Sequence, residues 1–148
     1  MLRAAARLSV VVLLAAVLVS GSQMSPLSAD PRDRGTTYVT SNCLRVMTEP
    51  PRIMFACADG GYYVDHLTWN RWHTWRAAGF GLFHANDCRP SCAEGTFHTA
   101  WGHLRLRLRV RCDRPAVFVF DRARVRYQGM LQGRTEVSFG HLGCPLRL

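Results

Sequence analysis

Residues 104–112 read LRLRLRVRC, and after a short turn residues 117–127 read VFVFDRARVRY. Apolar and charged residues alternate in both segments with a period of two, which is typical of a β-strand with one buried and one exposed face. With Arg114 and Pro115 at the centre of the turn, the two segments form a hairpin whose apolar faces coincide. This register places Arg111 opposite Phe118, Arg109 opposite Phe120, Arg107 opposite Arg122 and Arg105 opposite Arg124.

The exposed face of this predicted hairpin is rich in arginine. The two arginines opposite phenylalanine are expected to form cation–π contacts, worth roughly 0.5–1 kcal/mol each when exposed. The two Arg–Arg pairs place like charges directly opposite each other, which is destabilising, and no position on this face is acidic. Asp121 falls on the apolar face, where it either marks a bulge or reaches an arginine.

Two interpretations of the arginine-rich face remain open. It is either a solvated outer face that resists edge-to-edge aggregation, or a docking surface for a polyanion. The second interpretation rests on the guanidinium group, which matches phosphate and carboxylate with paired hydrogen bonds. The candidate anion-binding residues are Arg105, Arg107, Arg109, Arg111, Arg122, Arg124 and Arg126.

Short apolar segments separated by turn residues continue on both sides of the hairpin. Seven short strands at this spacing predict an all-β fold, a compact antiparallel β-sandwich or a partly open barrel. Gly79 and Gly81 alternate within one of these segments and indicate a bulge or a close backbone approach. The expected strands are residues 38–46, 53–58, 62–69, 79–85, 96–112, 117–127 and 135–139.

The amino terminus has the three parts of a secretory signal peptide. Two arginines precede an apolar run at residues 8–19, and small polar residues follow it. The run is shorter than the roughly 20 residues that span a bilayer, and an uncleaved membrane anchor is the alternative. We therefore expect a signal helix in residues 1–21, a flexible leader in residues 22–37, one β domain in residues 38–148, and secretion to the medium or the cell envelope.

Six cysteines follow the signal peptide, an even number that indicates a disulfide framework in a small exported chain. Cys43 and Cys144 lie near the two ends of the domain, and we expect them to pair with each other. Spacing leaves the pairing of the other four open. The expected disulfide cysteines are Cys43, Cys57, Cys88, Cys92, Cys112 and Cys144.

All 19 basic residues of the chain are arginine. Without the signal peptide, 17 arginines face 10 acidic residues, a net charge of +7. A basic exported protein can associate with anionic envelope polymers, phospholipid head groups or nucleic acid, and charge alone does not choose among them.

Three tryptophans occur at intervals of three residues. We expect Trp69 and Trp72 to lie in the core, because each can bury a large area. Trp75 has polar neighbours and is expected to be partly exposed. It is a candidate aromatic contact for a sugar ring or a lipid surface.

The tryptophan region contains four short motifs. They are Cys57-Ala58-Asp59-Gly60, Leu67-x-Trp69-x-x-Trp72, Ala77-x-Gly79-x-Gly81 and Asn86-x-Cys88-x-Pro90-Ser91-Cys92-Ala93-x-Gly95. With these motifs the chain resembles a family of small uncharacterised exported proteins from actinobacteria. The resemblance covers roughly residues 53–125 and implies no activity that can be transferred to individual residues. It implies that Cys57, Cys88, Cys92 and Cys112 form two core bridges, which leaves Cys43 and Cys144 for each other.

Signatures of catalysis are scarce in this sequence. It has no G-x-S-x-G nucleophile motif and no glycine-rich phosphate loop. Ser138, His141 and Asp121 form a triplet of a kind that any chain of this size offers. A zinc site on Cys88 and Cys92 conflicts with oxidised cysteines, so no metal or cofactor is expected.

These observations favour an exported, non-enzymatic protein that binds anionic envelope or extracellular polymers through the arginine-rich strand face. A small secreted hydrolase acting on envelope polymers is the alternative. A protein-directed module, such as an inhibitor or effector, is a third hypothesis.

Overall fold

The computed structural model describes residues 35–145. The expected signal peptide and nearly all of the expected leader lie outside the described residues. The described part consists of strands and turns, which confirms the all-β class, and it contains no helix long and apolar enough to cross a membrane. The strands are β1 (Thr37–Thr40), β2 (Val46–Met47), β3 (Ile53–Met54), β4 (Tyr62–His73), β5 (Arg76–Asn86), β6 (Phe97–Arg111), β7 (Phe118–Leu131) and β8 (Arg134–Gly140).

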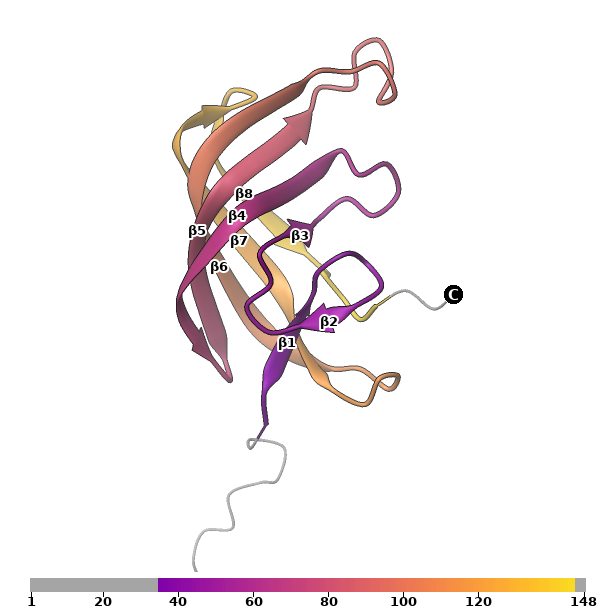
Figure 1. The fold of residues 1–148 in the computed structure, drawn as a ribbon, viewed down its shortest axis with the longest axis vertical. Coiled ribbons are helices and arrows are strands. Elements are labelled where there is room, and N and C mark those ends of the chain that lie inside the picture. Colours follow the sequence, from indigo (N-terminus) through magenta and orange to yellow (C-terminus); the bar gives the residue numbers. More distant parts are fainter. Residues whose placement is uncertain (1–34, 146–148) are drawn as a thin grey trace, which may run out of the picture.

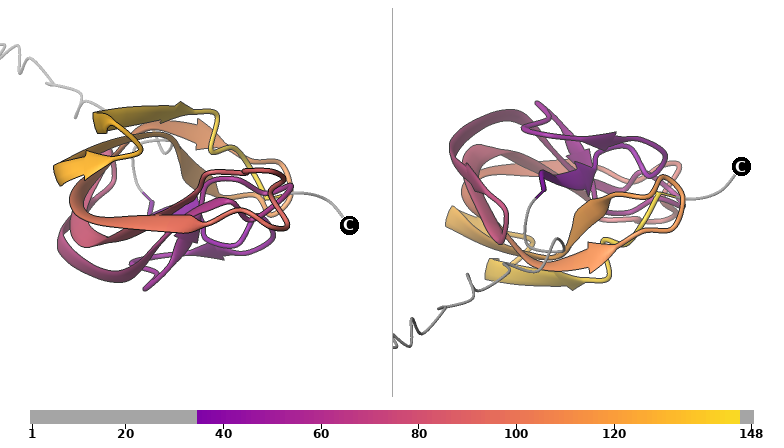
Figure 2. Two further views of the ribbon diagram at one scale, coloured as in Figure 1. Left: turned by 90° about the horizontal axis from the view of Figure 1, so that it is seen from above. Right: turned by 90° about the horizontal axis from the view of Figure 1, so that it is seen from below.

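All eight strands belong to one curled sheet (Figure 1). The order is β2-β1-β7-β6-β5-β4-β3, and β8 also pairs with β7. β1 runs parallel to β7, and the other pairs are antiparallel. The two ends of the sheet meet where the Met54 amide donates a 2.8 Å hydrogen bond to the Ser41 carbonyl. The fold is therefore the partly open barrel form of the prediction, and the views along the barrel show its curl (Figure 2).

The inner face of the curled sheet holds the hydrophobic core. Phe83 from β5, Leu104 from β6 and Val125 from β7 are fully buried there. Alternate residues of β6 and β7 point to the opposite, outer face, as the period of two predicts. The core cluster comprises Val39, Ile53, Val64, Leu67, Ala77, Phe83, Ala85, Leu104, Leu106, Phe120, Ala123, Val125, Tyr127 and Leu131.

The predicted register of the β6–β7 hairpin is confirmed, but the alternation of its faces breaks at one residue. Leu108 has a left-handed φ of 57°, and its side chain is 51 % exposed although it was expected in the core. Asp121, on the strand opposite, is buried. Its Oδ1 accepts a 3.2 Å hydrogen bond from the Gly143 amide, and its Oδ2 lies 3.6 Å from Nε of Arg122. The observed pairs are Arg105–Arg124, Arg107–Arg122, Arg109–Phe120 and Arg111–Phe118.

The expected exposure of Phe120 is wrong. This ring is fully buried and packs edge-to-face against Trp72, with 5.6 Å between ring centroids. The Arg109 guanidinium instead lies 3.6 Å from the centroid of Phe118, and the expected Arg111 contact with the same ring is present at 5.9 Å. Burying a phenyl ring stabilises a fold by about 1.5–3 kcal/mol, more than an exposed cation–π pair contributes.

Gly81 and Gly79 mark both a bulge and a close backbone approach, as their positions indicate. A Cβ at Gly81 would lie 2.8 Å from the Asp65 carbonyl oxygen, and one at Gly79 would lie 2.9 Å from that of Thr68. The partner strand β4 shifts register between Asp65 and Thr68, where His66 has a left-handed φ of 50°. These glycines let β4 fold tightly over β5.

The tryptophans follow their predicted order of burial. Trp69 and Trp72 are half-buried and pack against the core, and each indole N–H donates a hydrogen bond to a backbone carbonyl, of Pro50 at 3.0 Å and of Thr37 at 2.9 Å. Trp75 is 56 % exposed at the β4–β5 turn.

The three disulfides join Cys43 to Cys57, Cys88 to Cys92, and Cys112 to Cys144. The expected Cys43–Cys144 bridge is therefore wrong. Of the other four cysteines, Cys88 and Cys92 do pair with each other, but Cys57 is bonded to Cys43 and Cys112 to Cys144. Cys43 follows β1 and lies beside Cys57 in the loop after β3. Cys144 lies after β8, where the chain returns to Cys112 at the end of β6. Distance along the sequence did not reveal which of these segments are neighbours in space.

Candidate anion-binding face

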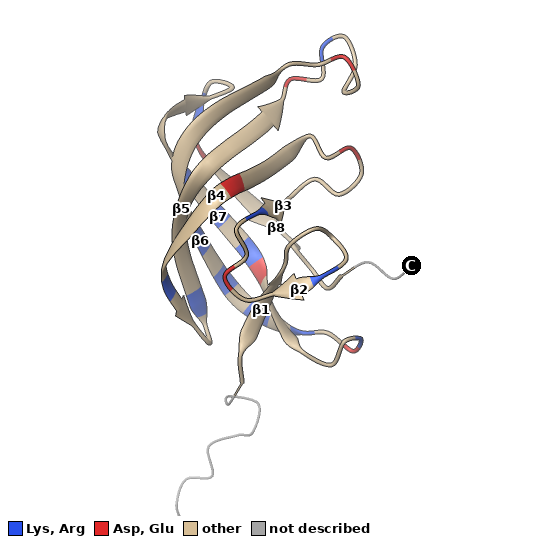
Figure 3. Cartoon of the chain, in the orientation of Figure 1, with Lys and Arg blue, Asp and Glu red and all other residues tan. Residues whose placement is uncertain are grey.

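The exposed arginines of β6 and β7 alternate with buried residues and lie on the outer face of the sheet. Figure 3 shows where basic residues occur along the strands. Arg105 lies directly opposite Arg124, and Arg107 lies directly opposite Arg122. These side chains border a shallow cleft of about 300 Å³. We define the arginine face as the exposed residues Arg105, Arg107, Arg122, Arg124 and Arg126.

Two of the seven candidate arginines lie apart from this face. Arg109 is only half-exposed. One of its guanidinium nitrogens donates a 3.4 Å hydrogen bond to the Gly35 carbonyl, and the guanidinium group lies 5.3 Å from the centroid of the Trp75 ring. Arg111 lies toward Phe118. The break at Leu108 separates these two residues from the regular part of the strand.

Glu136 supplies a counter-charge that the hairpin sequence did not reveal. β8 pairs with β7 and places Glu136 opposite Arg126. Oε1 of Glu136 accepts a 2.7 Å hydrogen bond from Nε of Arg124, and Oε2 lies 3.5 Å from Nε of Arg126. The Arg124 hydrogen bond lowers the pKa of Glu136, and the same bond raises the pKa of Arg124. The expectation that the face has no internal acid is therefore wrong.

The neutralisation by Glu136 covers only part of the arginine face. Arg122 has Asp121 as a neighbour at 3.6 Å. Within residues 35–145, neither Arg105 nor Arg107 has an acidic partner. These two guanidinium groups are the ones most available to an external anion.

Arg71 extends the arginine face across two further strands. The strand registers align Arg71 of β4 with Ala78 of β5, Ala78 with Arg105, and Arg105 with Arg124. Ala78 is small and leaves a cleft of about 440 Å³ that Arg71, Arg76, His103, Arg105 and Arg107 all line. Sequence reasoning missed Arg71 and Arg76, because only the pairing of β4 with β5 brings them beside the hairpin.

Aromatic side chains continue the same outer face toward the start of β6. Phe80 and Trp101 stack with 5.4 Å between centroids and planes 8° apart, and His103 lies 5.0 Å from Phe80. Trp101 is 43 % exposed. Sequence reasoning missed this row, although its signal was present. The alternation that places Arg105 and Arg107 outward continues toward the start of β6. It also places outward Phe97, Thr99, Trp101 and His103.

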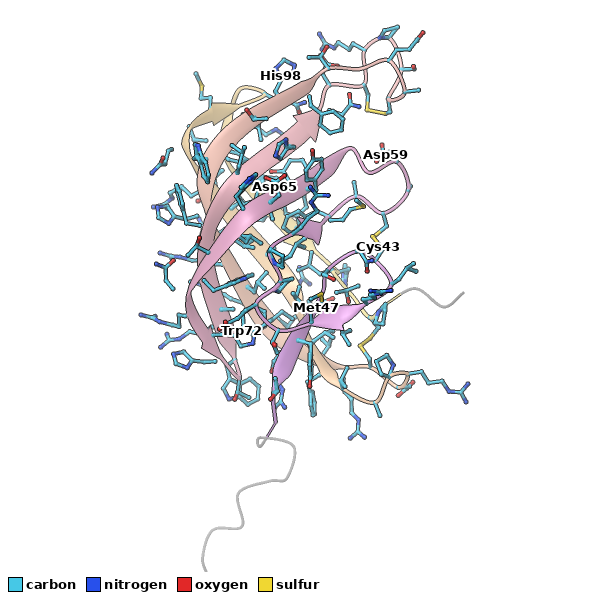
Figure 4. The ribbon with its side chains drawn as sticks, viewed as in Figure 1. Cys43, Met47, Asp59, Asp65, Trp72 and His98 are labelled. Carbon is cyan, nitrogen blue, oxygen red and sulfur yellow. A yellow bond between two sulfur atoms is a disulfide. The ribbon has the colours of Figure 1, made fainter. Side chains whose placement is uncertain are left out.

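A partly buried carboxylate, Asp65, lies on β4 (Figure 4). Its Oδ1 contacts Nδ1 of His66 at 2.8 Å and Nε2 of His84 at 3.0 Å, and its Oδ2 lies 3.4 Å from Arg52. Burial alone would raise the pKa of Asp65. The hydrogen bonds from the two histidines together outweigh burial, and the pKa of Asp65 is lowered.

The residues proposed for other chemistries are arranged differently. Nδ1 of His141 lies 3.5 Å from Oδ2 of Asp121, but within the described residues no hydrogen bond joins Ser138 to either of them. Cys88 and Cys92 are bonded to each other, so their sulfur atoms are not available as zinc ligands.

Comparisons of the chain with protein-family models, with curated proteins and with solved structures each find no match.

Proposed function

We propose that this protein is exported and binds an anionic polymer of the cell envelope or its surroundings, without catalysing a reaction on it. The observation that carries the proposal is the row of arginine residues that Arg71, Arg105 and Arg124 form across β4 to β7. Strands lie about 4.8 Å apart, so the backbone positions that carry these arginines follow one another at intervals of about 10 and 5 Å across the sheet.

The composition of the face supports a polymer with both anionic groups and rings. Arginine matches phosphate and carboxylate with paired hydrogen bonds. The neighbouring Trp101 and Phe80 offer a flat apolar surface on which a sugar ring or a base can stack. A purely solvated strand face has no need of exposed tryptophan beside its arginines.

The three disulfides support the exported location. Disulfides form and persist in oxidising compartments and are rare in the cytosol. A signal peptide in residues 1–21 and membership of the exported actinobacterial family are parts of the same proposal.

The test measures binding of the mature protein to anionic vesicles, a teichoic-acid-like polymer, an acidic polysaccharide and DNA at two salt concentrations. We expect binding to at least one polymer at low salt and a steep loss at high salt, because counterions are released on binding. The face variant Arg105→Ser/Arg107→Ser removes two arginines of the face that have no acidic partner within residues 35–145. For a phosphate polymer, the slope of log affinity against log salt should fall in magnitude by about 1.4–1.8.

The matched control is Arg45→Ser/Arg114→Ser, which removes the same charge from exposed positions away from the arginine face. It should retain most of the binding. Absence of binding at low salt would overturn the proposal. Equal losses in the two variants would show that net charge, rather than the arginine face, attracts the polymer.

A further inference from the structure

A cavity of about 740 Å³ opens at one end of the barrel, on the inner side of the sheet. It lies between the loop of residues 87–96 and the β7–β8 turn, near His98 in Figure 4. The side-chain amide of Gln132 donates a 3.2 Å hydrogen bond to the Ala85 carbonyl and holds the β7–β8 turn beside β5. We call it the end cavity; its lining includes Tyr62, Arg89, His98, Tyr127, Arg134 and Phe139.

One wall of the end cavity is aromatic. The Phe139 ring stacks on Phe55 at 4.6 Å and lies 4.9 Å from the Tyr62 ring. Leu131 and Val137 complete this side. A flat ring or a short apolar group can pack against these side chains.

Two tyrosine hydroxyls meet in the same cavity. Those of Tyr62 and Tyr127 are hydrogen-bonded to each other, so one donates to the other. The hydrogen of the accepting hydroxyl is left to donate elsewhere. Burial raises the pKa of both tyrosines, which keeps both hydroxyls neutral at ordinary pH and able to donate.

The remaining wall is cationic. Arg89 and Arg134 line the cavity, and neither guanidinium group has an acidic partner within the described residues. Asp87 also lines it, but its carboxylate accepts hydrogen bonds from the amides of Thr96 at 2.9 Å and Arg89 at 3.1 Å and contacts His98 at 3.2 Å. Both carboxylate oxygens of Asp87 are therefore already engaged, by amides of its own loop and by His98 of β6.

We infer that the end cavity binds a small organic anion, with a carboxylate or phosphate group at Arg89 and Arg134 and a flat ring against Phe139. The tyrosine pair supplies a neutral hydrogen-bond donor to the same ligand. The volume of the end cavity lies within the range of about 300–1,000 Å³ that is typical of ligand pockets. Such pockets often occur at the open ends of β-barrels. The site lies on the inner side of the sheet and is independent of polymer binding at the arginine face.

The test uses the mature, isotopically labelled protein and follows backbone amide signals during titration with phenyl phosphate, benzoate, inorganic phosphate and benzyl alcohol. We expect saturable shifts at residues 85–89, 98 and 131–139. Phenyl phosphate should bind more tightly than inorganic phosphate, which lacks the ring, and than benzyl alcohol, which lacks the charge.

Two variants assign the binding to the end cavity. Arg89→Gln/Arg134→Gln should weaken phenyl phosphate binding at least tenfold, because each lost charged hydrogen bond is worth about that much. Arg105→Gln/Arg107→Gln on the outer face should leave it within about twofold. Three results would overturn the inference. One is that saturable shifts are confined to the arginine face, another is that the cavity variant binds as tightly as the parent, and the third is that no probe gives a saturable shift.

Discussion

Glu136 of β8 holds Arg124 of β7 with a hydrogen bond of 2.7 Å between Oε1 and Nε. The same carboxylate lies 3.5 Å from Arg126, so one acid partly neutralises two arginines of the proposed binding face. It competes with any external anion for these two groups. Substituting Glu136 alone should therefore change the affinity of the arginine face for an anion.

We expect Glu136→Gln to bind the anionic polymer about two- to fivefold more tightly at low salt, because the substitution removes a surface ion pair that competes with the polymer for Arg124 and Arg126. The gain should shrink as salt rises, because screening weakens exposed charges. Polymer titrations at two salt concentrations measure it. Glu49→Gln, at an exposed position away from the face, is the control. Unchanged or weaker binding by Glu136→Gln would contradict the role given to the arginine face.

The lowered pKa of Asp65 predicts a contribution to stability that is lost in acid. Its pKa in the folded state lies below the ordinary value of 3.8, so the unfolded state binds more protons in that range. The contribution is complete above pH 3.8 and disappears as the pH falls through the lower folded-state value. Asp65→Asn should be less stable than the parent at pH 7 and should lose less stability below pH 4. Denaturant unfolding from pH 7 to 3 measures both effects, with Asp113→Asn in an exposed turn as control. Parallel pH curves for Asp65→Asn and the parent would refute this.

The disulfides should differ in their contribution to stability. The Cys112–Cys144 bridge spans 32 residues and the Cys88–Cys92 bridge spans 4. Chain entropy predicts that replacing both cysteines by serine costs about 3.7 kcal/mol for the first and about 1.9 kcal/mol for the second. Denaturant unfolding in non-reducing buffer compares the two double variants. The prediction fails if the short bridge proves the more costly to remove.

Gly81 should not tolerate a side chain. A Cβ there would meet the Asp65 carbonyl at 2.8 Å, and forcing an extra methyl into a packed site costs about 1–3 kcal/mol. Gly129 has nothing within 4 Å of the same position and is the matched control. We expect Gly81→Ala to lower the free energy of unfolding by that amount and Gly129→Ala to change it by less than about 0.5 kcal/mol. Equal stability of the two variants would rule out the close approach of β4 and β5.

Trp72 and Trp75 should respond differently to truncation. Trp72 packs on Phe120 and donates to the Thr37 carbonyl, so Trp72→Ala should cost about 3 kcal/mol. Trp75 is 56 % exposed, and Trp75→Ala should cost less than about 1 kcal/mol. Thermal unfolding of both variants measures this difference. A larger loss for Trp75→Ala would invert the assignment.

Much of the hairpin could be predicted from its residues. The period of two placed Arg105, Arg107 and Arg124 on one face, and the turn at Arg114 and Pro115 set the register that β6 and β7 adopt. The prediction failed at Leu108, where a residue with a left-handed φ interrupts the alternation. Phe120 packs inward against Trp72 of β4, and local alternation carries no information on a contact between segments so distant in the chain.

The candidate site shows the same division. Arg105 and Arg107 were evident from the sequence, whereas Arg71 and Glu136 join them only through strand pairing with β5 and β7. The alternation along the sequence could have placed Trp101 on the outer face. Its stacking on Phe80 could not be predicted in this way, because Phe80 lies on the partner strand β5.

By itself, the sequence determined the all-β class and the pairing within the central hairpin, because both depend on the alternation of neighbouring residues and on a turn. Only the tertiary structure decided which cysteines are bonded, where Glu136 lies, and that an end cavity forms around Tyr62 and Tyr127. These features join segments that are distant in the chain. Their proximity depends on how the whole sheet curls, and the curl depends on pairing between strands that lie far apart in the chain.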